Sequence, residues 1–190
     1  RSLFSVNSAS AAAQLAHITL WTDMSRPTLD FTIYLTGYDV QTFNLGPIFR
    51  TGQLPLLEGP KPDIPATVNF DQNAGAFSIS TNDPAITAGE SAACTFPLPT
   101  NLPANFLNFI QQVHTGNPIP PGFANAGLCA ATVGGGLGSQ GLGIQDNIAR
   151  GYLTVDVVSN CTQFVVTQTG YFDTALKTEA NANVIWGDFF

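Results

Sequence analysis

Two stretches near the start of the chain alternate apolar and polar residues with a period of two. In residues 16–21 the even positions are apolar, and in residues 29–36 the odd positions are apolar. This alternation, rich in Thr and aromatic residues, is typical of strands with one buried face. The residues between them, Met24 to Pro27, contain turn formers. The pattern therefore predicts two neighbouring strands joined by a turn.

Several shorter segments are also predicted to be strands, because they are rich in apolar and β-branched residues. They are residues 4–6, 40–45, 67–70, 76–80, 152–157, 164–167 and 184–190. Asp71 to Gly75 is rich in turn residues, so 67–70 and 76–80 are expected to form a hairpin. The last segment is apolar and aromatic, which predicts a final strand.

The middle of the chain is rich in residues that interrupt strands. Twelve of the 13 prolines lie between Pro47 and Pro121, and ten of the 18 glycines lie between Gly116 and Gly151. One helix is predicted there, at about residues 103–114, with Pro103 in its first turn and Gly116 as its stop. Its apolar side consists of Leu102, Phe106, Phe109, Ile110 and Val113.

These elements predict a mainly β protein. Six to nine short strands, one helix and no βαβ alternation favour an antiparallel β-sandwich of jelly-roll or Ig-like type. We expect a single domain over residues 1–190. Residues 51–144 are expected to form a Pro/Gly-rich, loop-rich insertion that carries the helix.

Composition narrows the classes of function and location. Hydrophobic residues make up 44% of the chain and charged residues only 10%, with a net charge of -7. An acidic chain argues against a nucleic-acid partner, and no apolar run reaches the roughly 18 residues of a membrane span. The few charges and the start at Arg1 favour an exported protein, extracellular or at the cell surface, whose signal peptide has been removed.

The three cysteines fit an oxidising compartment better than a metal site. Cys94 and Cys129 bracket the least regular part of the chain, and we predict a disulfide between them. Cys161 is then left over, as a buried thiol or an intermolecular partner. Asn160 opens an Asn-Cys-Thr glycosylation sequon, which matters only in a glycosylating pathway.

No set of catalytic residues is evident. Residues 136–141 match G-x-G-x-x-G, but later glycines interrupt the helix that a dinucleotide site needs. Ser139 lacks the frame of a nucleophilic serine. His17 is a lone histidine on a strand, and His114 is expected to interact with the helix dipole at a C-terminus. We predict no enzymatic activity and no cofactor.

Acidic residues leave two alternatives open. A carboxylate-based hydrolase would need two facing acids, and a calcium site would need several oxygen ligands. The acids in the strand-rich parts are Asp23, Asp30, Asp39, Asp156 and Asp188. None lies in a recognisable motif, so solvated faces and turns are their expected places.

Aromatic residues suggest two kinds of contact. Trp21 and Tyr34 fall on the polar faces of their strands, where they could stack on a glycan or be covered by other parts of the protein. Unpaired strands at the ends could instead pair with another chain. The residues expected in such assembly strands are Phe4, Val6, Val184, Ile185, Trp186, Phe189 and Phe190.

Two parts of the chain resemble a group of uncharacterised exported bacterial proteins. The resemblance rests on the LWTD, PTLDF and YLTGYDVQ segments of residues 20–41, and on ARGYLTVD at 149–156, Cys161, Gly170 to Phe172 and the WGD of 186–188. It covers about two-fifths of the chain. It implies export but no activity and no site residues, and it implies that related chains continue past the WGD segment.

Together these observations favour an exported, non-enzymatic structural or interaction protein. We expect a homo-oligomer or polymer, plausibly a filament or matrix subunit built by strand pairing. A carbohydrate-binding or adhesion module that contacts surface glycans is the first alternative, and the carboxylate-based hydrolase is the second.

Overall fold

A computed structural model describes residues 2–55, 67–71, 76–80, 101–117, 147–158 and 183–189. These residues form eight strands and two helices. In chain order they are β1 (Leu3–Ser8), β2 (Gln14–Thr22), β3 (Pro27–Leu35), β4 (Val40–Asn44), α1 (Leu45–Thr51), β5 (Thr67–Asp71), β6 (Ala76–Ser80), α2 (Ala104–Thr115), β7 (Gly151–Val158) and β8 (Ile185–Phe189).

The strands form two sheets, which confirms the prediction of a mainly β protein. The smaller sheet has the order β4-β1-β8 and is antiparallel throughout. In the larger sheet β2 pairs antiparallel with β3 and β7, and β6 and β5 extend it beyond β3. The β3–β6 pair is parallel, so the larger sheet departs from the purely antiparallel pairing expected. The predicted hairpin of β5 and β6 is confirmed.

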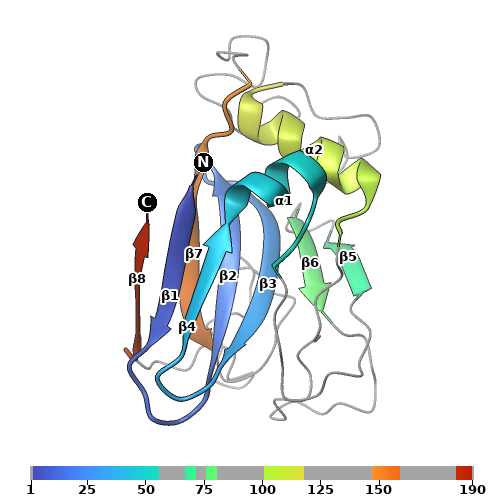
Figure 1. Ribbon diagram of the computed structural model, residues 1–190. Helices are drawn as coiled ribbons and strands as arrows, with labels where there is room; N and C mark the ends of the chain where they lie inside the picture. Colours follow the sequence, from blue (N-terminus) through green and yellow to red (C-terminus); the bar gives the residue numbers. More distant parts are fainter. Residues whose placement is uncertain are drawn as a thin grey trace.

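The first and last strands of the chain pair with each other. β1 lies in the centre of the smaller sheet, between β4 and β8, and Phe4 is opposite Phe189. The two ends therefore lie side by side (Figure 1). Both edges of β1 are used inside the chain, which leaves Phe4 and Val6 no backbone edge to offer a second chain.

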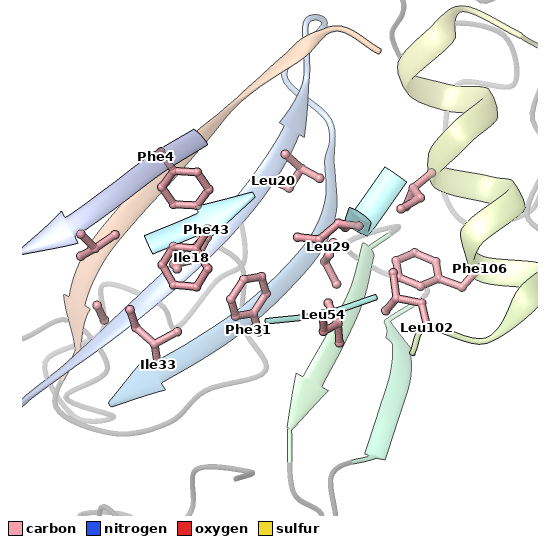
Figure 2. Close-up of a cluster of buried hydrophobic side chains, with 14 of the residues drawn as sticks. Phe4, Ile18, Leu20, Leu29, Phe31, Ile33, Phe43, Leu54, Leu102 and Phe106 are labelled. Carbon is pink, nitrogen blue, oxygen red and sulfur yellow. The ribbon is translucent and has the colours of Figure 1, made fainter. Parts of the chain in front are cut away.

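Apolar side chains from both sheets share one core. Phe4 stacks on Phe43 within the smaller sheet, with ring centroids 4.8 Å apart. Phe43 in turn meets Phe31 of the larger sheet at 6.1 Å, which joins the two sheets. Figure 2 shows these rings beside Ile18 and Ile33 of the larger sheet. Each such burial stabilises the fold by about 1.5–3 kcal/mol.

The prediction of one buried face for the strands of residues 16–21 and 29–36 is wrong. His17, Thr19 and Asp30 are fully buried on the polar face, and Trp21 is 2% exposed. The alternation in the sequence shows which residues are polar, but it does not show which side chains are exposed to solvent. Polar side chains tolerate burial where hydrogen bonds replace water.

The predicted helix is confirmed as α2, with its five expected apolar residues all buried. Pro103 is the N-cap residue, one position before the helix, and Gly116 ends the helix with a left-handed φ of 79°. α1 is not predicted by the apolar pattern. Its signals are Asn44, whose side chain accepts a hydrogen bond from Gly46 N, and Gly52 with φ 71°.

Several predictions concern residues outside the described ranges. They are the cysteines Cys94, Cys129 and Cys161, the sequon at Asn160, the glycine motif of 136–141 with Ser139, the strand at 164–167 and Phe190. Most of the expected insertion of residues 51–144 also lies outside these ranges. The disulfide, the insertion and the single-domain organisation stay predictions.

Candidate functional site

A cavity of about 940 Å³ opens between the two sheets at the edge formed by β7 and β8. The strands β1 and β8 form one wall, and β7 forms the opposite wall. α1 and the end of α2 close it at one end, which is the upper end of the sheets in Figure 1. Cavities of roughly 300–1,000 Å³ accept small molecules. This cavity is therefore the strongest candidate binding site in the described part of the chain.

The walls of the cavity are mostly apolar because both sheets turn their inner faces toward it. Phe4 and Val6 face inward from β1, and the register places Ile185 and Gly187 of β8 on the same face. On β7, Leu153 and Val155 lie opposite the core residues Leu20 and Ile18, and both remain half-buried. Gly187 approaches β1 closely, because a Cβ at this position would lie 2.5 Å from the Ser5 carbonyl oxygen.

Two arginines line the end of the cavity near the helices. Arg50 is exposed at the end of α1, and its Nε donates to the Gly46 carbonyl at 3.3 Å. Arg150 is half-buried just before β7, and its Nη1 donates to the Ile148 carbonyl at 3.1 Å. They are two of only six Lys and Arg residues in a chain of net charge -7. The charged residues of the described lining are these two arginines and Asp188 of β8, so the cavity combines mostly apolar walls with a net positive charge.

His114 contacts three of the segments that form this end of the cavity. Its Nδ1 lies 2.8 Å from the Arg150 carbonyl, its Nε2 lies 2.8 Å from Thr28 Oγ1, and its ring packs edge-on against Phe49. A carbonyl only accepts, so Nδ1 carries the proton that it donates to the Arg150 carbonyl. Thr28 Oγ1, which lies beside Nε2, also donates to the Leu20 carbonyl at 3.1 Å. Burial lowers the pKa of His114 to about 4, against smaller opposite effects of the Arg150 carbonyl and Asp23.

The sequence predicts His114 as a partner of the helix dipole at a C-terminus, and the strength of that interaction depends on the charge of the ring. The residue does lie at the C-terminal end of α2, but it is 1% exposed and neutral at pH 7. Its place could have been read from the sequence, since His114 follows Ile110 by four residues and so continues the apolar stripe.

The structure does not bring Trp21 and Tyr34 together at an exposed surface. Trp21 is buried, donates from Nε1 to Thr154 Oγ1 at 2.9 Å and stacks on Tyr152. Tyr34 is half-buried and lies opposite Leu15, at the other end of the β2–β3 pair from Trp21. The strand alternation places both residues on the same face but cannot show how far apart they lie along it.

A second group of polar residues lies on the buried outer face of the larger sheet. His17 Nε2 is 3.4 Å from Asp30 Oδ2, and His17 Nδ1 is 3.1 Å from Thr32 Oγ1. Asp156 of β7 lies opposite His17 in the register. Burial lowers the pKa of His17 to about 4, so the imidazole is neutral at pH 7. The sequence singled out each of these residues without indicating that three strands bring them together.

The other acidic candidates lie apart from this group. Asp39 accepts hydrogen bonds from the Thr36 amide and hydroxyl in the β3–β4 turn, as a turn residue would. Asp188 lies on exposed β8, opposite Ser5. Asp23 lies in the β2–β3 turn. Among the described residues, no group of three or more His, Cys, Asp or Glu could hold a metal ion, and calcium binding stays a prediction.

The residues of the predicted final strand lie at an edge of the smaller sheet. Ile185, Trp186 and Phe189 belong to β8, and Val184 precedes it and accepts a hydrogen bond from Ala9 N at 2.7 Å. Trp186 is 57% exposed and Phe189 is 87% exposed. No described strand pairs with the outer edge of β8.

The sequence pattern missed the cavity because it depends on which strands come to lie at the open edges of two sheets. The sequence contains one weak signal of the cavity, the positions of Arg50 after an apolar segment and of Arg150 before one. No helix in the described ranges has the length and apolarity needed to cross a membrane.

No family model, curated protein or solved structure matches this chain.

Proposed function

We propose that this protein is an exported, non-enzymatic structural or interaction protein that associates with copies of itself through β8. The observation that supports this proposal is the exposure of β8. Four of its five residues are exposed, two of them are large aromatics, and only Asp188 is charged. Natural edge strands usually carry charges, prolines or bulges that prevent pairing, and β8 has few of these.

The remaining edges support this role less well. β4 is the other edge of the smaller sheet, and it leads directly into α1 and exposes Val40 as its one large apolar side chain. β1, which the sequence also suggested for assembly, is paired on both sides. We therefore assign self-association to β8 and propose that the product is a homo-oligomer or a polymer.

We also propose that the two sheets form a β-sandwich of jelly-roll or Ig-like type. The contact between Phe31 and Phe43 supports face-to-face packing of the sheets. The pairing of the first strand with the last one supports a closed arrangement within one chain. A sandwich would present β8 at its rim, where a neighbouring copy could add a strand.

Size-exclusion chromatography with light scattering over a range of protein concentrations tests the self-association. We expect a mass above that of the 20.1 kDa monomer, rising with concentration, and negative-stain microscopy should show ordered assemblies. The variant with Trp186→Lys and Phe189→Lys should shift the distribution to the monomer, because charges on both sides of β8 oppose close pairing. Met24→Lys is the matched control, since Met24 is an exposed residue of the β2–β3 turn.

A wild-type protein that stays monomeric at high concentration would contradict the proposal. So would an assembly that withstands the two β8 charges but dissociates with Met24→Lys. The glycan-binding alternative has little support from the geometry, because Trp21 is buried and Tyr34 lies far along the hairpin from it.

A further inference from the structure

We propose that the cavity between β7 and β8 binds a single-chain fatty acid, with the alkyl chain between the sheets and the carboxylate at Arg50. This inference concerns a ligand site and goes beyond the self-association proposed above. Neither proposal depends on the other.

We infer the apolar part of the ligand from the apolar side chains that line the cavity. Leu153 and Val155 of β7 are only half-buried, although they face the inner side of a sheet whose other inner residues form the core. An alkyl chain would cover the surface that these two side chains still expose. A sugar or another polar ligand would instead place hydroxyl groups against Leu153 and Val155, whose side chains offer no hydrogen-bond partner.

We infer the charge of the ligand's head group from the charged residues at the end of the cavity that α1 and α2 close. Arg50 is exposed beside the cavity, and Arg150 lines the same end, linked to α1 through His114 and Phe49. His114 is neutral there and adds no charge of its own at pH 7. A guanidinium binds a carboxylate through charge-assisted hydrogen bonds. An anionic head group is therefore favoured over a neutral or cationic one.

The geometry of the cavity agrees with a ligand of this shape. Its volume of about 940 Å³ is at the upper end of the range for small-molecule sites, and it extends from the α1 end along β7 to Val155 and Ile185. An elongated ligand with one charged end matches an elongated cavity that has its cations at one end.

Isothermal titration calorimetry with octanoate, decanoate and dodecanoate below their micellar concentrations tests the proposal at neutral pH. We expect one site per chain and a dissociation constant that falls about threefold to fourfold per added methylene, because each buried methylene adds to the binding free energy. Decyltrimethylammonium has an alkyl chain one methylene longer than that of decanoate and a cationic head, and it should still bind at least tenfold more weakly than decanoate.

Two pairs of variants connect the binding to named residues. Arg50→Gln should weaken decanoate binding about tenfold and leave decanol binding unchanged, while Arg26→Gln, outside the cavity lining, should change neither. Val155→Trp should fill the cavity and abolish binding of both ligands, while Val40→Trp on exposed β4 should not. Circular dichroism identifies folded variants, and Leu153→Phe replaces Val155→Trp if the latter does not fold.

The proposal is overturned if dodecanoate shows no saturable binding, or if affinity does not rise with chain length. It is also overturned if folded Val155→Trp or Leu153→Phe binds like the wild type. Equal affinity for decanoate and decyltrimethylammonium, or no effect of Arg50→Gln, would overturn the assignment of a carboxylate ligand.

Discussion

His114 connects three parts of the chain through one imidazole ring. It belongs to α2, contacts Thr28 at the start of β3, and bonds to the carbonyl of Arg150 before β7. In return the Arg150 amide donates to the His114 carbonyl at 2.9 Å. With both ring nitrogens in use and Phe49 against the ring edge, the side chain fixes the end of the cavity.

The buried histidines predict a loss of stability in mild acid. Burial lowers the pKa of His17 and of His114 from 6.5 to about 4. Between these values the unfolded chain binds protons that the folded chain does not, so stability is complete above pH 6.5 and falls as the pH drops toward 4. Each histidine contributes roughly 3 kcal/mol to this fall. Urea unfolding at several pH values measures it.

The variants His114→Gln and His17→Gln separate the two contributions. Each variant lowers stability at pH 7, but each should also reduce the slope of stability against pH by about half of the part that the histidines contribute. An unchanged slope in both variants would show that the histidines are not buried in the neutral form.

The buried polar residues of the larger sheet show which properties of a single residue the polarity pattern predicts. It predicts the face of the strand but not the exposure of the side chain. The alternation placed the apolar residues Ala16, Ile18 and Leu20 of β2 on one face, and the register pairs them with the apolar residues Ile33, Phe31 and Leu29 of β3. Exposure was wrong for His17, Asp30 and Trp21. Their burial depends on what covers the outer face, and that information is not contained in a strand's own period of two.

At the scale of elements, the segment that enters β7 runs unusually close to β2. Gly151 lies opposite Thr22, and a Cβ at Gly151 would lie 2.1 Å from the Trp21 carbonyl and 3.0 Å from His114 Nδ1. The first of these atoms belongs to the backbone of a central strand and cannot move easily. Glycine is therefore required for this approach, which also brings Arg150 to the cavity.

Gly151→Ala should destabilise the protein by about 1–3 kcal/mol, because β7 must shift to make room for the methyl group. Gly46→Ala is the matched control. A Cβ at Gly46 would first meet the flexible end of Arg50, at 2.8 Å from Nη2, so we expect a change within about 0.5 kcal/mol. Denaturant unfolding compares the two variants, and equal stabilities would contradict the close approach at β7.

The two helices differ in how much of them local sequence reveals. α2 has 12 residues, a continuous apolar stripe and a glycine stop, and these signals predict it within one residue at each end. α1 has seven residues and one buried side chain, Ile48. A helix this short depends on its caps and on contacts with neighbours, such as the hydrogen bond from Gln111 Nε2 to the Phe49 carbonyl at 2.7 Å.

At the scale of the whole molecule, the contact between Phe31 and Phe43 predicts that the two sheets stabilise each other. A double-mutant cycle with Phe31→Leu and Phe43→Leu should give a coupling energy of about 0.5–1.5 kcal/mol. The control cycle pairs Phe43→Leu with Tyr152→Leu on the outer face of the larger sheet, where we expect additivity within about 0.5 kcal/mol. Denaturant unfolding provides all the values. Additivity in the first cycle would argue against face-to-face packing.

The sequence by itself determined the β class, the positions of most strands and of α2, and the inner faces of β2 and β3. These features follow from local periodicity and from turn and cap residues, which act over a few positions of the chain. Only the tertiary structure decided that β1 pairs with β8, that the polar face of β2 and β3 is buried, and that a cavity lies between β7 and β8. The physical reason is that pairing, burial and cavities depend on segments far apart in sequence. Leu153 and Ile185 line the same cavity although each belongs to an edge strand of a different sheet, and no local pattern encodes which edges lie together.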